Sequence, residues 1–592
     1  MEFSFGGSET NQRTVLGHPS GLFVLFFTEM WERFSFYGMR VLLVNFLTMA
    51  ITGVDNPGWG WNAEQAGALF GTYAGFLYLT PLLGGIIADK VTGYKWAVII
   101  GATIMTLGHV SMALENETSM YLGLTLLVLG TGFFKPNMTS IISEMYTKAP
   151  KKKDGAYTIY YMGVNAGAFF GMMLCGYLAE TKGWAYGFGL AGIFMLFGTI
   201  QFWLSSPLFG KIGEVPKKQS TIENKKIIKA SVGQTNPFTT IDKILILICS
   251  IVGLLYLLDD PSSKIANINL LPSTLFVDSV SGATQSILLA LGGFLFLIIS
   301  RILRYEKVIR DRMIALIVFA IFTIFFWMSF EQGATSLIIF ARDYTQRELI
   351  GNYAIAYNLI NTLLTIIPLA IISWVLFLLY KQTHQLIKTS NIILIISFLV
   401  IWTIVGGMIY DQFRSETTIV TVSWFSTLNS FFIIAFASLF SKWWESKYNP
   451  TSAQKYSLGL ILLGIGFAFL AFGAQTIPSG TVAGTFRVSM IWLILAYLFH
   501  TLGELCLSPV GLSQVSKLVP AKMIGFMYGM WFLAIAIGNK IAGSLGGKIE
   551  SITNEYNLST FFLIFTLVPI FAGLVVALLN KKLIKLSHGI DA

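Results

Sequence analysis

The stretch Glu29-Met30-Trp31-Glu32-Arg33-Phe34-Ser35-Phe36-Tyr37-Gly38-Met39-Arg40 places four charged side chains in the middle of an apolar run that extends over residues 22–50. Inserting Glu or Arg near the centre of a membrane-spanning helix costs roughly 2.5–3.5 kcal/mol per residue, so the cluster burdens the helix by on the order of 10 kcal/mol. A helical period gathers these charges and Tyr37 on one stripe, within an arc of roughly 140°. The cluster therefore favours a functional helix. The alternative is a structural ion pair that neutralises itself.

The composition of the chain is that of a membrane protein with many spans. Of its 592 residues 55% are hydrophobic and only 12% are charged, and the mean hydropathy is +0.69. Such a chain is too apolar for a soluble globule and too long for a single anchor. The first 20 residues are polar and lack the apolar core of a signal peptide, so we expect the first spanning helix to direct insertion.

The cysteines and the net charge argue against several kinds of site. Cys175, Cys249 and Cys506 each lie inside an apolar run, where a thiol acts as a small hydrophobe, so we expect neither a disulfide framework nor a metal site. The formal net charge of +10 comes from lysines and arginines in loops, not on a face interleaved with aromatic residues. This distribution argues against nucleic acid as a partner. No cofactor is expected.

Sixteen apolar runs in the sequence are long enough to span a membrane. They lie at residues 22–50, 66–88, 96–114, 120–142, 156–179, 186–208, 244–259, 284–302, 313–340, 353–380, 390–410, 423–441, 456–474, 488–510, 524–547 and 560–580. Basic residues gather in the loops 148–153, 217–229, 301–312 and 581–585, and these loops fall on one side. The positive-inside rule makes that side cytoplasmic, which predicts that both termini are cytoplasmic.

The runs predict an all-α protein built from two six-helix bundles and extra hairpins. Residues 1–208 form the N-terminal bundle, and residues 209–312 form a cytoplasmic linker and an extra hairpin. Residues 313–592 form the C-terminal bundle, with a second hairpin inserted at about 353–410. The run 244–259 is the shortest and ends in Asp259-Asp260, and we expect it to pair with the run 284–302 as the extra hairpin.

A loop motif follows the second run. The segment Gly85-Ile86-Ile87-Ala88-Asp89-Lys90-Val91-Thr92-Gly93-Tyr94-Lys95 resembles the GxxxD(R/K)xxG motif of the major facilitator superfamily. An acid at the end of one helix with bases beside it is suited to latch neighbouring helices on the cytoplasmic side. The resemblance therefore assigns Asp89 and Lys90 to gating, and the alternative is an ordinary charged loop.

The opening cluster resembles the ExxERFxYY motif of the proton-dependent oligopeptide transporter (POT) family, and further segments agree with it. Residues 130–137 (GTGFFKPN) and 157–167 (YTIYYMGVNAG) are similar to the fourth- and fifth-helix signatures of that family. Residues 326–333 (FWMSFEQG) resemble its FWxxFEQ motif, and residues 503–513 (GELCLSPVGLS) its GELxLSPxGLS motif. The resemblance implies a major facilitator fold with about 16 transmembrane helices, and a proton-coupled symporter that imports di- and tripeptides by alternating access. It also implies a monomer in the lipid of a bacterial cytoplasmic membrane.

A peptide carries an amine at one end and a carboxylate at the other, so its site needs an acid and bases held apart. The resemblance implies that Glu504 binds the amine and that Arg40 and Lys135 bind the carboxylate. The further peptide-binding residues that it implies are Tyr37, Tyr78, Asn165, Asn429, Ser508 and Trp531. Lys135, Glu331 and Glu504 also stand alone in apolar runs, where an ionisable residue is a functional candidate. For the neutral polar residues the alternative is a bridge between helices.

Proton coupling is assigned by the resemblance together with the logic of the charges. The residues are Glu29, Glu32, Arg33, Lys135 and Glu331. We expect Glu331 to pair with Arg40 in one state, and protonation of Glu331 to release Arg40 for the peptide carboxylate. Glu29 and Glu32 form a second proton-sensitive group beside Arg33 and Lys135.

Two departures from the family pattern bear on the site. Phe36 stands where the family usually has a tyrosine, so one phenol is missing. Residues 426–434 resemble the eighth-helix SxNPxFII motif with Ser430 in place of proline, which makes Asn429 the site residue and 353–410 an insertion. The alternative alignment makes Asn361 the eighth-helix asparagine.

Other functions fit the sequence less well. A related carrier of nitrate, amino acids or another small solute is the alternative within transport, although an anion carrier has no use for an acid such as Glu504 at an amine site. A membrane enzyme or receptor needs a nucleophile, a metal triad or a soluble domain. The sequence has no G-x-S-x-G, H-E-x-x-H or phosphate-loop motif, so no enzyme activity is expected.

Overall fold

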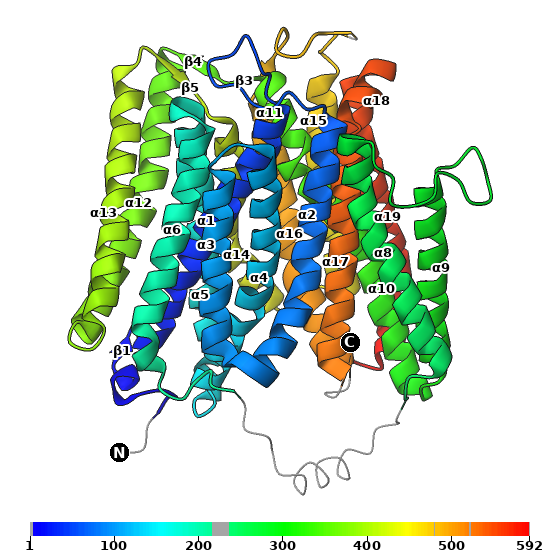
Figure 1. Cartoon of the computed structure of the whole chain (residues 1–592), viewed down its shortest axis with the longest axis horizontal. Helices are drawn as coiled ribbons and strands as arrows, with labels where there is room; N and C mark the ends of the chain where they lie inside the picture. Colours follow the sequence, from blue (N-terminus) through cyan, green and yellow to red (C-terminus); the bar gives the residue numbers. More distant parts are fainter. Residues whose placement is uncertain (1–3, 216–235, 479, 520–522, 591–592) are drawn as a thin grey trace, which may run out of the picture.

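Every apolar run of the sequence contains a helix in the computed structural model, which describes residues 4–215, 236–478, 480–519 and 523–590 (Figure 1). The first long helices are α1 (Ser20–Thr48), α2 (Ala63–Ile87), α3 (Gly93–Met112), α4 (Glu117–Met145), α5 (Lys153–Lys182) and α6 (Trp184–Ser205). A hairpin of α8 (Thr240–Ala266) and α9 (Gly282–Leu303) follows. The remaining helices are α10 (Lys307–Phe330), α11 (Ser336–Asp343), α12 (Asn352–Thr383), α13 (Lys388–Arg414), α14 (Val422–Trp444), α15 (Ser452–Ala474), α16 (Ile491–Leu518), α17 (Ile524–Gly546), α18 (Ile549–Glu555) and α19 (Leu558–Ser587).

The prediction of about 16 transmembrane helices is confirmed in the described part of the chain. Thirteen helical segments are long and apolar enough to cross a membrane, and one of them runs through both α2 and α3. The charge-bearing α1 and the 23-residue α17 complete the set of sixteen. α1 begins and α19 ends at the same end of the bundle (Figure 1). We call this end, which carries the loops 148–153 and 301–312, the basic end.

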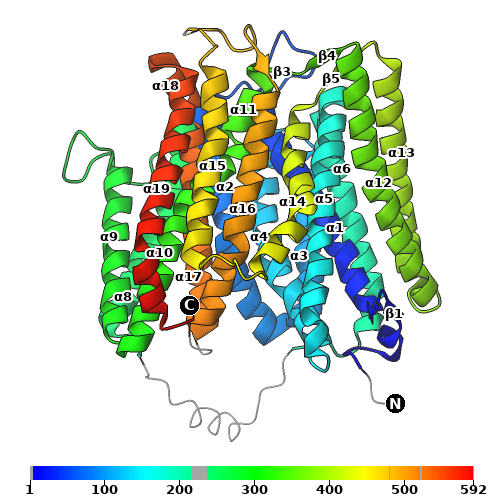
Figure 2. The same cartoon turned by 180° about the vertical axis from the view of Figure 1, so that it is seen from behind.

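The two extra hairpins flank the bundle on opposite sides (Figures 1 and 2). α8 packs beside α2 and α9 beside α10, whereas α13 packs against α6. The segment predicted as an insertion, at about 353–410, corresponds to the hairpin α12–α13. Of the predicted cytoplasmic linker, residues 216–235 lie outside the described residues.

The helix that contains the short run 244–259 extends past Asp259-Asp260. α8 continues to Ala266, because both carboxylates are satisfied within the fold. Asp260 pairs with Lys264 one turn later and with Lys540 of α17. Asp259 Oδ1 accepts the backbone N–H groups of the loop after the helix, at 2.6 and 2.9 Å. Satisfied in this way, the acids stabilise the end of the helix instead of breaking it.

The run 313–340 does not form one continuous helix. A 3₁₀ segment, Glu331–Ala334, separates α10 from α11. The side-chain amide of Gln332 donates a hydrogen bond to the backbone carbonyl of Met328, just before the break, at 3.0 Å. It also donates to the carbonyl of Ala542 on α17 at 3.1 Å. The break places Glu331 at the centre of the bundle, at a turn of the chain where its side chain faces the other half of the protein.

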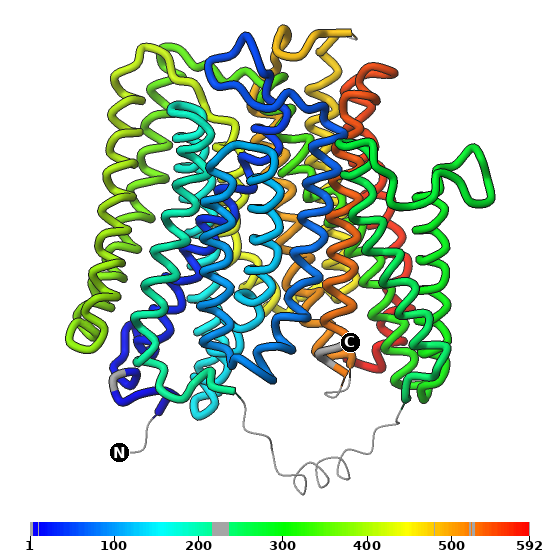
Figure 3. The backbone as a smooth tube through the Cα atoms, viewed as in Figure 1, coloured from blue at the N-terminus to red at the C-terminus, as the bar shows by residue number. Residues whose placement is uncertain are grey.

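The two halves approach each other most closely at the end opposite the basic loops. α2 and α17 lie side by side there (Figure 3), and a Cβ atom added to Gly67 would collide with the carbonyl oxygen of Gly543. On the other side of the bundle, a Cβ atom on Gly176 of α5 would collide with Ser423 of α14. Small residues thus allow close approach of the helices across both seams at this end.

Only short strands connect the helices in the described residues. β1 (Thr14–Val15) pairs with β2 (His18–Pro19) before α1. At the opposite end β3 (Thr345–Gln346) pairs with β6 (Val488–Ser489), and β4 (Glu348–Ile350) pairs with β5 (Thr417–Ile419). These pairs tie loops together and leave the core entirely helical.

Candidate functional site

A cavity lies between the two halves, bounded by α1, α2, α4 and α5 on one side and by α10, α14 and α16 on the other. Its walls combine apolar and aromatic side chains with a few charged groups, as ligand sites commonly do. The lining residues are Arg33, Phe36, Tyr37, Arg40, Val41, Leu77, Tyr78, Thr131, Lys135, Met172, Trp327, Phe330, Glu331, Gly333, Ala334, Ser426, Asn429, Tyr497, His500 and Glu504.

The charged stripe of α1 forms a buried ion network beside this cavity. Nε of Arg33 lies 2.8 Å from Glu29 Oε1 and 2.7 Å from Glu32 Oε2. The phenol of Tyr160 on α5 donates a hydrogen bond to Glu29 Oε2 at 2.5 Å. Two carboxylates therefore share one guanidinium, and the network is short of one positive charge. A proton or Lys135 can supply that charge.

The second charged group joins the two halves directly. The guanidinium of Arg40 on α1 is paired with the carboxylate of Glu331 at the break between α10 and α11. The guanidinium carbon of Arg40 lies 5.7 Å from the ring centroid of Tyr37 and 5.8 Å from that of Phe70. The two rings thus flank the guanidinium in cation–π contacts. The structure thus contains the Arg40–Glu331 pair that the charge logic expects.

Lys135 is the cation of the cavity that has no acidic partner. Its Nζ lies 4.9 Å from the ring centroid of Tyr78, in a cation–π contact between α4 and α2. Among the described residues, no carboxylate oxygen lies within 4.0 Å of this Nζ. The charge of Lys135 is therefore available to an anionic ligand.

Glu504 is the corresponding acid without a cation. Its carboxylate accepts a hydrogen bond from Nδ2 of Asn429 at 2.9 Å, and Asn429 also donates to Thr501 at 3.1 Å. Among the described Lys, Arg and His residues, none lies within 4.0 Å of the Glu504 carboxylate. The cavity therefore has cations on the walls from α1 and α4 and an unpaired acid on the wall from α16. A zwitterion matches this arrangement.

The cavity is open toward the basic end. Tyr161, one turn nearer that end than Asn165 on α5, exposes 52% of its surface. At the other end the contacts of Gly67 with Gly543 and of Gly176 with Ser423 close both seams. The structure is therefore closed at the end opposite the basic loops and open at the basic end.

Not every predicted site residue lines the cavity. Asn165 donates to the carbonyl of Tyr161 on its own helix at 3.0 Å, and Trp531 packs on Gly511 of α16. Ser508 and these two residues stand outside the lining. In the predicted gating motif, Asp89 accepts a hydrogen bond from Tyr94 at 2.9 Å, a contact within its own loop. Lys90 is exposed beside it.

The two candidates for the eighth-helix asparagine occupy different places. Asn429 lines the cavity and binds Glu504. Asn361 lies on the inserted α12, where its oxygen accepts a hydrogen bond from the indole of Trp424 at 3.1 Å. The geometry therefore supports the alignment in which residues 353–410 are the insertion.

Several polar residues of the site were not selected from the sequence. Tyr160, Tyr497 and His500 fall in this group, although Tyr160 stands inside the quoted fifth-helix signature. A second set, centred on Lys540 of α17, lies outside the cavity. Lys540 stands alone in an apolar run, which is the signal that identified Lys135. Among the described residues, no group of three His, Cys, Asp or Glu side chains is arranged to hold a metal ion.

Comparison with known proteins gives a consistent set of relatives. A family model described as the POT family matches residues 95–394 and 395–562. The chain is 31% identical to a peptide transporter, YePEPT, of Yersinia enterocolitica over 91% of this chain and 89% of that protein. It is 28% identical to a di-/tripeptide transporter of Lactococcus lactis subsp. cremoris over 97% and 98% of the two chains. A crystal structure of a mutant peptide transporter POT in complex with alafosfalin superposes with a TM-score of 0.69, at 27% identity and 97% coverage of both chains.

Proposed function

This chain belongs to the POT family, and we propose that it is a proton-coupled symporter that imports di- and tripeptides by alternating access. The observation that carries the proposal is the separation of unpaired charges in the cavity. Among the described residues, Lys135 has no acidic partner on one wall and Glu504 has no basic partner on the other. A peptide carries the two missing charges at its own ends, and no cofactor is needed.

The peptide is held by its termini. Its amine binds Glu504, whose second contact, Asn429, remains available to a peptide amide. Its carboxylate binds Lys135 and, once free, Arg40. Tyr37 and Tyr78 line the same space and offer hydroxyl groups to the peptide backbone. Side chains of the peptide have apolar walls to occupy, so recognition of the termini is compatible with many sequences.

Proton coupling follows from the cost of unpaired buried charges. Removing one partner of a buried ion pair costs about 3–5 kcal/mol, because the other charge is left uncompensated. If Glu331 is protonated while no peptide is bound, Arg40 is left without a counter-ion. If the peptide binds without a proton, the Glu331 carboxylate competes with the peptide carboxylate for Arg40. Binding both together avoids each penalty. The Arg40–Glu331 pair therefore favours joint binding of proton and peptide.

The network of Glu29, Glu32 and Arg33 supplies a second proton site. It has two carboxylates for one guanidinium, and Tyr160 already donates to one of them. A proton on Glu32 neutralises the network when Lys135 turns toward the peptide. Release of that proton attracts Lys135 to the network again and completes the cycle.

The orientation of the protein in the membrane follows from the distribution of basic loops. The positive-inside rule makes the basic end cytoplasmic, so the structure is an inward-open state and both termini are cytoplasmic. We place the protein in a bacterial cytoplasmic membrane as a multi-pass monomer. Asp89 and Lys90 then lie at the inner end of α2, where they act on closure of the inner gate.

Transport by purified protein in proteoliposomes tests the proposal. With an inward proton gradient, labelled dialanine should accumulate above its external concentration, and a protonophore should abolish this accumulation. The variant Glu331→Gln, which removes the proposed proton-binding carboxylate, is measured in the same assay. Its matched control is Glu445→Gln, which changes an exposed glutamate at the end of α14. Accumulation of nitrate, with none of dialanine, would establish the alternative carrier and contradict the proposal.

A further inference from the structure

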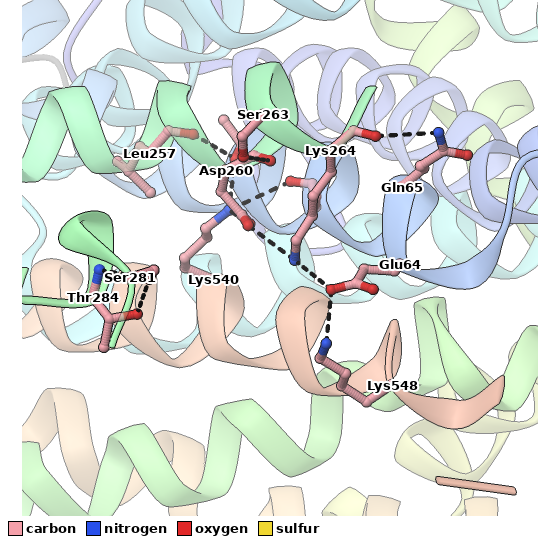
Figure 4. A network of polar contacts seen from close by, with 12 residues as sticks. Glu64, Gln65, Leu257, Asp260, Ser263, Lys264, Ser281, Thr284, Lys540 and Lys548 are labelled. Atoms are coloured by element: carbon pink, nitrogen blue, oxygen red, sulfur yellow. Dashed lines mark hydrogen bonds and ion pairs between the residues drawn. The ribbon is translucent and has the colours of Figure 1, made fainter. Parts of the chain in front are cut away.

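A network of charged residues lies at the end of the bundle opposite the basic loops (Figure 4). It runs from Lys540 on α17 through Asp260 and Lys264 on α8 to Glu64 on α2 and Lys548 before α18. Lys264 lies 3.0 Å from Asp260 and 3.2 Å from Glu64, and Lys548 lies 2.7 Å from Glu64. The network therefore joins the N-terminal bundle, the C-terminal bundle and the first extra hairpin.

Lys540 is the most deeply buried member of this network. Only 5% of its surface is exposed, and its Nζ is paired with Asp260. The same Nζ donates to the hydroxyl of Thr72 on α2 at 2.8 Å. A lysine inside a membrane helix is costly to bury and marks a functional position by default. The peptide site does not use it.

The hairpin α8–α9 is attached to α2 by its own backbone. Pro261 has no N–H group, so the carbonyl of Leu257 one turn earlier loses its usual helical partner. The hydroxyl of Thr72 donates to this carbonyl at 2.7 Å. Nearer the outer end, the side-chain amide of Gln65 donates to the carbonyl of Lys264 at 3.2 Å. These contacts fix Asp260 to the N-terminal bundle.

The network spans the closed seam between α2 and α17. At this level a Cβ atom on Gly71 would lie 3.0 Å from the carbonyl oxygen of Lys540, and Gly67 is in backbone contact with Gly543. In alternating access this seam is the outer gate, because it must separate before the cavity opens at the outer end. Separation of α2 from α17 also pulls Asp260 away from Lys540.

We propose that the hairpin α8–α9 is a latch for the outer gate, in which Asp260 holds Lys540 across the seam and thereby favours the inward-open state. This inference rests on the alternating-access function proposed above. Outward opening leaves Lys540 without its counter-ion and without Thr72, and the cost of that buried charge opposes opening. The latch acts at a distance from the peptide site and needs no peptide.

Removal of the latch charge should shift the conformational equilibrium in the absence of substrate. Spin labels at Thr118→Cys on α4 and Ser551→Cys on α18 report the outer distance between the halves, in a background with Cys175, Cys249 and Cys506 replaced by alanine. Both labelled positions are exposed helix residues at the outer end. Asp260→Asn should raise the ratio of the long-distance to the short-distance population by about tenfold or more.

A matched control lies at the other end of the same hairpin. Asp242 pairs with Arg301 at 3.1 Å and with Arg304 at 2.7 Å, within the hairpin and away from the seam. Asp242→Asn removes a paired hairpin carboxylate without touching the gate, so it should leave the distance distribution unchanged. A shift as large as that of Asp260→Asn would mean that hairpin integrity, and not the latch, controls the gate.

A double variant distinguishes loss of the latch from the cost of leaving Lys540 without a counter-ion. Asp260→Asn with Lys540→Gln removes both charges and leaves no uncompensated cation. A latch predicts that the double variant still populates the open outer gate more than the parent protein. Return of the double variant to the parental distribution, or no shift for Asp260→Asn itself, would overturn the proposal. The distance measurement uses no peptide, so its failure is distinguishable from failure of the transport function.

Discussion

Replacing Glu504 with Gln tests how the cavity recognises the amine of a peptide. The substitution keeps the size of the side chain and its hydrogen bond from Asn429, which is 2.9 Å long. It removes the negative charge that α16 presents to the peptide amine. Among the described residues, no cation lies within 4.0 Å of the carboxylate, so the substitution breaks no ion pair there.

The size of the effect follows from the interaction that is lost. A hydrogen bond to a charged group contributes about 1.5–3 kcal/mol, which corresponds to about a 10- to 150-fold change in affinity. Dialanine should lose affinity by this factor in Glu504→Gln. N-acetyl-dialanine carries no cationic amine, so it binds weakly to both proteins and should change by less than about threefold.

Competition for uptake of a labelled dipeptide measures both affinities in the same proteoliposomes. The exposed Glu445→Gln variant controls for the loss of one negative charge and should match the parent protein with both ligands. Equal losses for dialanine and N-acetyl-dialanine in Glu504→Gln would refute the assignment, because the damage would then be independent of the amine.

Three further predictions concern coupling and topology. Glu32→Gln should abolish accumulation driven by a pH gradient while leaving counterflow exchange of peptide, because exchange moves no net proton; a variant that still concentrates dialanine would show that the α1 network is a structural ion pair. Lys135→Ala should reduce both accumulation and exchange by at least about tenfold, since it removes a charge-assisted bond to the peptide carboxylate; loss of accumulation alone would confine Lys135 to proton coupling. A cysteine introduced at His384, in the loop between α12 and α13, should react with a membrane-impermeant maleimide only from the cytoplasmic face, and labelling from outside would contradict the predicted orientation.

The helices could be predicted from the sequence because span length and apolarity are local properties. Each of the sixteen predicted runs contains a helix, and the differences arose where a distant partner decides the outcome. Asp259 and Asp260 end the apolar run, and acids in that position usually face water. Lys540, which is 280 positions away, holds Asp260 inside the fold. No local pattern contains that partner.

The charged residues of the site could be predicted for a similar reason, and the neutral ones could not. A buried ionic group is expensive in a membrane helix wherever it points, so Arg40, Lys135 and Glu504 stand out in the sequence. The side chain of Asn165 is inexpensive to satisfy, and it bonds to its own helix at Tyr161. Whether such a residue faces the cavity depends on the rotation of its helix, which packing against other helices sets.

The two cross-seam ion pairs differ in what can replace them. In the Arg40–Glu331 pair, a peptide carboxylate and a proton take over the lost interactions, so the cost of breaking it depends on the cargo. Nothing in the cargo reaches Asp260 or Lys540, so the cost of breaking that pair is the same for the loaded and the empty protein. Glu331→Gln should therefore change the ratio of net uptake to exchange. Asp260→Asn should change both rates by the same factor, and a change in their ratio would show that the outer network senses the cargo.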